Sequence, residues 1–155
     1  MNATERVQTF INGMDEYINL KNICLSSSFN EEYKIPENFM LEDLNRLTRD
    51  DCFNYSYILY QYADYINMEK GRQLSVLNWC SVSLSEIISK SMDEYSFAEF
   101  TKHETKVSKI LQDNSVGSKI NEWKNIAESR VALLITKEQL IRKRADCLLE
   151  KGKRI

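Results

Sequence analysis

The clearest pattern of apolar and polar positions lies near the C-terminus, from about Lys119 to Glu150. Apolar residues recur there at intervals of seven: Ile120, Ala127, Leu134, Ile141 and Leu148. A second apolar row lies one position earlier: Ile126, Leu133, Leu140 and Cys147. A seven-residue repeat keeps one face of a helix turned toward a partner helix. The pattern therefore predicts one long amphipathic helix, and its double row indicates two packing neighbours.

Two kinds of partner fit this apolar seam, namely other helices of the same chain or a second copy of the protein. A helix of about 30 residues spans about 45 Å at 1.5 Å per residue. That length is large for a protein of 18.2 kDa. It favours self-association, with the first apolar row as the expected oligomer interface.

Apolar residues at helical spacing predict further helices upstream. We expect a helix over 4–23, a connection over 24–39, a short helix over 41–47, a long helix from Phe53 to about Lys90, and a short helix between Ser91 and Gln112. An aspartate of Asp50–Asp51 is expected to cap the long helix, and Ser118 the final one. The apolar spacing of the long helix is interrupted around Gly71, which allows a polar window, a kink or two separate helices.

The composition agrees with a chain made of helices. Only four glycines and one proline are present, and charged residues make up 28% of the chain. Turn-rich all-β proteins need more of both breakers. We therefore predict an all-α protein with an N-terminal helical appendage over 1–48 and an oligomeric long-helix bundle, or helical hairpin, over 49–155.

Charge is distributed unevenly although the net charge is only −2. Residues 1–69 hold 5 basic and 12 acidic side chains, whereas residues 130–155 hold 8 basic and 3 acidic ones. Such asymmetry indicates an acidic half that meets a basic end in an assembly, or a basic end that binds phosphates. A simple drift of charge along solvated helix faces explains it equally well.

The basic residues of the final helix form a line beside the apolar seam. Trp123, Arg130, Lys137, Arg144 and Lys151 recur at intervals of seven, and Arg142 and Lys143 thicken the line. A row of cations with an aromatic ring at one end suits a single-stranded nucleic acid, whose phosphates attract cations and whose bases stack on aromatic rings. The alternative is that these side chains lay their aliphatic stems along the seam and keep their charges in water.

Aromatic residues crowd the start of the long helix: Phe53, Tyr55, Tyr57, Tyr60, Tyr62, Tyr65 and Trp79. Nearby aspartates make this region acidic, which repels phosphate and favours a contact with protein. Tyrosines that pack in the core with their hydroxyls at the surface are the alternative.

Catalytic and metal-binding patterns are weak. His103 is the one histidine, in a charged stretch, and the cysteines Cys24, Cys52, Cys80 and Cys147 lie too far apart for zinc spacing. We expect reduced, buried cysteines, no enzyme activity and no cofactor or metal. The N-terminus lacks the apolar core of a signal peptide, and no apolar run approaches the roughly 18 residues of a membrane span. We therefore expect a cytoplasmic protein (in the host cell, if viral) without a membrane partner.

The layout resembles the phage recombination mediators of the UvsY type. The shared features are Trp79 within the first long helix, the stretch KILQD at 109–113, and an aliphatic helix that ends in a basic stretch. The likeness covers roughly residues 50–152. Proteins of this family form oligomeric rings, bind single-stranded DNA and load a RecA-like recombinase. They use basic residues near the end of the first long helix, where this chain has Lys90 alone.

The resemblance implies a non-catalytic recombination mediator that binds single-stranded DNA and a recombinase as an oligomer. The alternative is a protein-only phage adaptor, inhibitor or virion component that acts through its acidic, tyrosine-rich helical surface.

Overall fold

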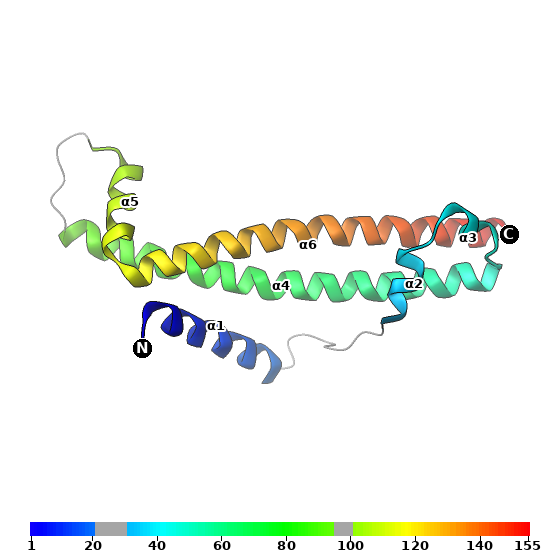
Figure 1. The fold of residues 1–155 in the computed structure, drawn as a ribbon, viewed down its shortest axis with the longest axis horizontal. Helices are drawn as coiled ribbons and strands as arrows, with labels where there is room; N and C mark the ends of the chain where they lie inside the picture. Colours follow the sequence, from blue (N-terminus) through cyan, green and yellow to red (C-terminus); the bar gives the residue numbers. More distant parts are fainter. Residues whose placement is uncertain (21–30, 95–100) are drawn as a thin grey trace. The chain divides into compact units, whose positions relative to one another are not determined.

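Helices make up every regular element among the residues that the computed structural model describes, which are 1–20, 31–94 and 101–155. This confirms the predicted all-α fold class. The elements are α1 (Ala3–Leu20), the 3₁₀ turn η1 (Glu31–Tyr33), α2 (Lys34–Glu37), α3 (Leu41–Asn45), α4 (Arg49–Glu94), α5 (His103–Asp113) and α6 (Ser115–Arg154). Figure 1 shows α4 and α6 as the two long helices.

The chain divides into two compact units, and each unit takes one part of α4 and one part of α6. Unit 1 comprises residues 1–23 and 72–130, and unit 2 comprises residues 24–71 and 131–155. Each unit buries its own cluster of apolar side chains.

The core of unit 1 is formed by one face of each contributing helix. Its buried residues are Val7 and Ile11 of α1, Val76, Cys80 and Leu84 of α4, and Ile120 and Ala127 of α6. The spacing of four within α1 and within α4 places these side chains on one face of each helix. Cys80 is buried, as expected from the sequence, and this burial raises the pKa of its thiol.

The core of unit 2 is an antiparallel seam between the first half of α4 and the end of α6. Five of its buried positions on α4 are spaced alternately by four and three: Cys52, Ser56, Leu59, Ala63 and Ile66. Tyr62 of α4 is buried in the same core. On α6 they are Val131, Ile141, Ala145, Leu148 and Gly152. The helices approach closely at small residues. The Ser56 hydroxyl donates a 2.9 Å hydrogen bond to the Ala145 carbonyl, and a Cβ at Gly152 would lie 3.0 Å from the Cβ of Cys52.

The segment before α4 packs against this seam. The Tyr33 ring stacks on the Tyr62 ring at a centroid distance of 3.8 Å, and Phe39 meets Tyr55 edge-on at 5.0 Å. Leu44 of α3 also contacts the core. The sequence predicted a connection over 24–39, but 31–37 is helical because its aromatic and proline side chains find apolar partners on α4 and α6. Residues 24–30 lie outside the described part.

The observed helix boundaries can be compared with those expected from the spacing of apolar residues. α4 runs through Gly71 without a break, because a single exposed glycine costs a helix only about 1 kcal/mol. The helix expected over 4–23 is α1 as far as Leu20, and residues 21–23 lie outside the described part. The helix expected over 41–47 is α3, which ends at Asn45. The one expected between Ser91 and Gln112 is α5, although Phe97 and Phe100, on which that prediction also rested, lie outside the described part.

Both predicted helix caps need correction. α4 is capped by Thr48, whose hydroxyl accepts from the Asp51 N–H at 3.1 Å while the Asp51 carboxylate accepts from the Thr48 N–H at 2.9 Å. This reciprocal pair is a capping box, so Asp51 is its third residue and not the cap. α6 begins at Ser115, before Ser118, because the Asn114 side-chain oxygen accepts from the Gly117 N–H at 2.9 Å.

The Thr48 cap yields a stability prediction. Thr48→Val should lower the free energy of unfolding by about 1 kcal/mol, because an N–H of the first helical turn loses its acceptor. Thr136→Val is the control, since Thr136 is exposed inside α6 and its hydroxyl donates to the Ala132 carbonyl one turn earlier. We expect this control to change the free energy of unfolding by less than about 0.5 kcal/mol. Urea titration followed by circular dichroism measures the free energy of unfolding of both variants. Equal losses in Thr48→Val and Thr136→Val would contradict the role of Thr48 as the helix cap.

The same capping box should respond to pH. Hydrogen bonds from the Thr48 backbone and hydroxyl lower the pKa of Asp51 in the folded state. The stability that Asp51 contributes is therefore complete above its unfolded pKa and is lost as the pH falls through its folded pKa. The difference in the free energy of unfolding between wild type and Thr48→Val should therefore decrease as the pH falls through the folded-state pKa of Asp51.

Candidate functional site

The first two residues of the predicted basic line, Trp123 and Arg130, lie in unit 1. Trp123 packs against the unit 1 core, and the Arg130 guanidinium lies 6.0 Å from the centre of its ring. The Trp123 Nε1 atom is buried, and it has no hydrogen-bond partner in the described part of the chain. Trp123 is thus half-buried with Arg130 near one face of its ring, and its stacking on a base stays a prediction.

Two further members of the line are held by α4 within unit 2. The Lys137 ammonium lies 5.2 Å from the centre of the Tyr62 ring, and its hydrogen bond to the Tyr62 hydroxyl raises the pKa of Lys137. The Arg142 guanidinium bonds to Asp64 at 2.9 Å, which is the main reason that its pKa is raised, and to Glu138 at 3.2 Å. These cations serve the fold, as the alternative interpretation of the line expected.

The remaining three members gather near the end of α6. Lys143 and Arg144 are exposed and Lys151 is half-buried, and none of them pairs with an acidic side chain in the described part of the chain. Arg144 donates one 3.3 Å hydrogen bond to the Glu37 carbonyl. Unneutralised charge therefore remains at this end of the line.

The first apolar row of α6 is core. Ile120 and Ala127 are buried in unit 1, Ile141 and Leu148 are buried in unit 2, and Leu134 packs against the unit 2 core. These five residues were expected to form the oligomer interface. They contact the protein's own helices instead, because the opposing face of α4 buries them, which is the other of the two alternatives considered.

The second apolar row is exposed. Leu133 and Leu140 keep 71% and 51% of their surface open, Ile126 keeps 36%, and Cys147 is exposed as a free thiol. The second packing neighbour expected on this row is the segment before α4, which approaches Leu140 and Cys147. The expectation that Cys147 is buried is wrong. α4 instead packs on the row that holds Val131, Ala145 and Gly152, because small side chains let the two backbones approach.

A groove in unit 2 joins the exposed row to the unneutralised cations. It has a volume of about 340 Å³ and lies between α6 and the segment before α4. Its apolar lining comes from Pro36, Phe39, Leu44, Leu59, Leu140, Cys147 and Leu148. Its charged lining comes from Lys143, Arg144 and Lys151, with one acidic residue, Glu37. Exposed apolar surface and three cations therefore meet in this groove.

The sequence pattern missed this groove. Its α6 side was visible as Leu140 and Cys147 beside Lys143, Arg144 and Lys151. Its opposite wall comes from Pro36 and Phe39 of the expected connection and from Leu44 of the expected short helix, and the pattern of neither segment indicates which helix it packs against. Only their packing against α4 and α6 reveals them as a wall.

Most of the tyrosines are part of the unit 2 core. Tyr62 is buried, Tyr55 and Tyr65 pack against the core, and the Tyr60 hydroxyl donates a hydrogen bond to Asp146 that raises the pKa of Tyr60. Among the tyrosines at the start of α4, Tyr57 is the exposed one. The alternative of core tyrosines with surface hydroxyls therefore describes them, and the acidic, tyrosine-rich surface shrinks to Tyr57 and its polar neighbours.

A layer of charged residues interrupts the apolar seam of unit 2. Lys70 and Glu138 occupy core positions of α4 and α6, where they form a half-buried ion pair at 3.2 Å. This is the polar window that the sequence allowed near Gly71. A charged pair inside a helical seam aligns the two helices, because any sliding leaves a charge without its partner.

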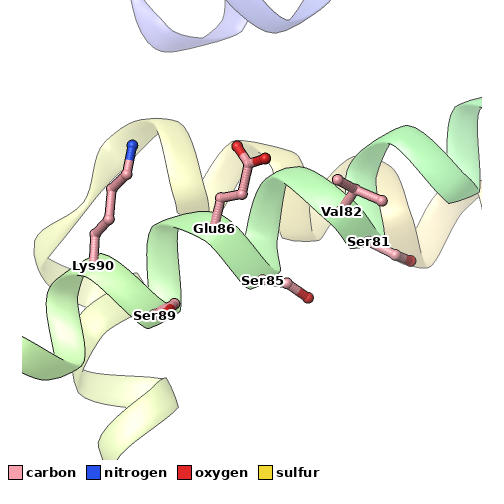
Figure 2. Close-up of a pocket in the computed structure, with 6 residues that line it drawn as sticks. All are labelled: Ser81, Val82, Ser85, Glu86, Ser89 and Lys90. Carbon is pink, nitrogen blue, oxygen red and sulfur yellow. The ribbon is translucent and has the colours of Figure 1, made fainter.

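Figure 2 shows a shallow depression on unit 1 whose lining comes from α4 alone. Ser81, Ser85 and Ser89 follow one edge, and Val82, Glu86 and Lys90 follow the other. Because one helix supplies every residue, no second wall brings polar groups together. Lys90 is the one cation among the residues that line this depression, whereas the UvsY-type family has several basic residues at the end of its first long helix.

Candidate metal ligands and the single histidine are spread over the described residues. No group of three or more His, Cys, Asp or Glu side chains there is arranged to hold a metal ion. His103 is exposed at the start of α5. Among the helices described, none has the length and apolar character needed to cross a membrane.

Comparison of the chain with protein families, with curated proteins and with solved structures gives no match.

Proposed function

We propose that this protein is a non-catalytic recombination mediator that binds single-stranded DNA and a protein partner, a recombinase, through the C-terminal end of α6. The observation that supports DNA binding is the cluster of Lys143, Arg144 and Lys151, which no acidic side chain neutralises in the described part of the chain. The likeness of residues 50–152 to the UvsY-type mediators supplies the biological role.

The cluster suits a phosphate backbone for a physical reason. Cations that already pair with carboxylates must break those pairs before they bind phosphate, whereas free cations only release the counterions of the nucleic acid. Arg142 belongs to the first kind and Lys137 is similarly held by Tyr62, whereas Lys143 and Lys151 belong to the second kind. DNA binding is therefore assigned to the last turns of α6 and not to the whole line.

A salt titration of oligothymidylate binding tests this proposal. Affinity should fall steeply with salt, and Lys143→Glu/Lys151→Glu should weaken binding and flatten the logarithmic slope by about 0.7 for each lost phosphate contact. These two positions are better than Lys137 or Arg144, because reversal there would also disturb contacts with Tyr62 or with the Glu37 backbone. Fluorescence anisotropy of a labelled oligonucleotide gives both quantities.

The control is Lys102→Glu/Lys109→Glu, which makes the same change in net charge at exposed positions around α5. It should leave the slope close to the wild-type value. Absence of binding at low salt, or equal losses in the two double variants, would refute the proposal.

A protein-only adaptor, inhibitor or virion component is the second candidate. The exposed apolar residues Leu133 and Leu140 favour it, because single-stranded DNA binds mainly through its phosphates and bases and gains little from aliphatic side chains. This candidate is favoured if the salt titration detects no DNA binding while a separate measurement detects binding to a protein.

A further inference from the structure

The groove of unit 2 combines two chemistries that one ligand must satisfy together. Its floor is aliphatic and aromatic, and its rim holds Lys143, Arg144 and Lys151. Phosphate backbones complement the rim and leave the floor unused. Apolar protein surface complements the floor and leaves three cations unpaired.

We propose that this groove binds an acidic amphipathic helix of a partner protein. Two or three apolar side chains of that helix, spaced by three or four residues, enter the floor beside Leu140 and Leu148. Aspartates or glutamates that flank them meet Lys143, Arg144 and Lys151. Charge complementarity selects this occupant, since the rim carries three cations against the single carboxylate of Glu37.

A helix suits the site better than an extended peptide. An extended segment leaves backbone N–H and C=O groups that need partners, and sheet-forming domains supply them from an exposed strand edge. The described part of this chain contains no strand. A helix satisfies its own backbone hydrogen bonds and presents only side chains to the groove.

The position of Leu140 provides a sharp test. Leu140 lines the groove while 51% of its surface remains exposed, so its replacement costs little core packing. Leu133 lies one heptad earlier on the same exposed row and does not line the groove. Leu140→Ser and Leu133→Ser are therefore matched variants that differ in whether they touch the site.

The experiment uses the full chain and three labelled synthetic peptides of about 14 residues. The first carries leucines at helical spacing among aspartates and glutamates, the second is its scrambled form, and the third replaces the acidic residues with lysines. Anisotropy should detect binding of the first peptide, with the other two at least about tenfold weaker. Leu140→Ser should weaken the first peptide about tenfold, and Leu133→Ser should leave it unchanged.

Three results would overturn the inference. The first is absence of binding by the acidic amphipathic peptide. The second is equal binding of the scrambled peptide, which would indicate charge attraction alone. The third is a mass measurement in which Leu140→Ser abolishes a dimer that Leu133→Ser preserves, without any peptide binding; a second copy of the chain would then be the occupant.

The inference does not depend on DNA binding, and the variants separate the two. Leu140→Ser keeps every cation, so it should spare oligothymidylate binding while it weakens the acidic peptide. Lys143→Glu/Lys151→Glu should weaken both ligands. If oligothymidylate binds and the acidic peptide does not, the cations serve a phosphate backbone and the proposed helix site is refuted.

Discussion

Replacing Leu59 with alanine is expected to lower the free energy of unfolding by about 2–5 kcal/mol. Leu59 has 0% of its surface exposed and lies at the centre of the unit 2 seam, between Ser56 and Ala63. Its truncation removes a buried apolar group and leaves a cavity that small neighbours cannot fill. The loss depends on how far the two helices collapse into that cavity, which is the reason for the wide range.

Urea titration followed by circular dichroism measures this loss of stability. Tryptophan fluorescence in the same titration shows which unit unfolds. Both tryptophans, Trp79 and Trp123, lie in unit 1, so tryptophan fluorescence reports that unit, whereas circular dichroism reports all helices. Leu59→Ala should lower the circular dichroism midpoint. A lower fluorescence midpoint in the same variant would indicate that the two units unfold together.

Leu133→Ala is the matched control for this experiment. Leu133 has the same side chain on a long helix of unit 2 but is 71% exposed. Its replacement should change stability by less than about 0.5 kcal/mol. Equal effects at positions 59 and 133 would mean that the seam described for unit 2 is wrong.

Replacing Gly152 with leucine is expected to cost about 1–3 kcal/mol or more. Even a Cβ at this position would lie 3.0 Å from the Cβ of Cys52 and 3.1 Å from the Phe53 ring, and Gly152 is buried. A leucine side chain must therefore push the end of α6 away from the start of α4. Loss of that contact also weakens the nearby Ser56–Ala145 hydrogen bond.

Gly71→Leu separates this steric effect from helix propensity. Gly71 is exposed inside α4, and a Cβ there would meet no atom within 4 Å. Leucine favours a helix over glycine by about 0.8 kcal/mol, so the Gly71 variant should be more stable than wild type. A Gly152 variant that is also more stable would show that α4 and α6 do not approach closely there.

The exposed row of α6 and its groove change how the basic line is understood. The sequence suggested one continuous DNA-binding track, but Lys137 and Arg142 are held by Tyr62 and Asp64. The cations left over surround an apolar groove. This arrangement is the basis for assigning both proposed ligands to the end of α6.

The all-α fold and the course of the long helices could be predicted from the residue pattern alone, because a 3.6-residue period leaves its mark on any helix with one buried face. The pattern also located the polar window near Gly71, since charged residues replace apolar ones at core positions. Single boundaries were less certain, because Asp51 and Ser118 look as suitable for capping as Thr48 and Asn114.

The buried face of α6, by contrast, depends on packing between distant segments. The row that contains Leu140 and the row that contains Ile141 are adjacent and equally apolar in the sequence. α4 covers the row of Ile141 together with Ala145 and Gly152, because small residues allow close approach. Leu140 is thereby left at the surface beside Lys143, and short segments from elsewhere in the chain complete the groove. Such contacts between distant residues leave no period in the sequence.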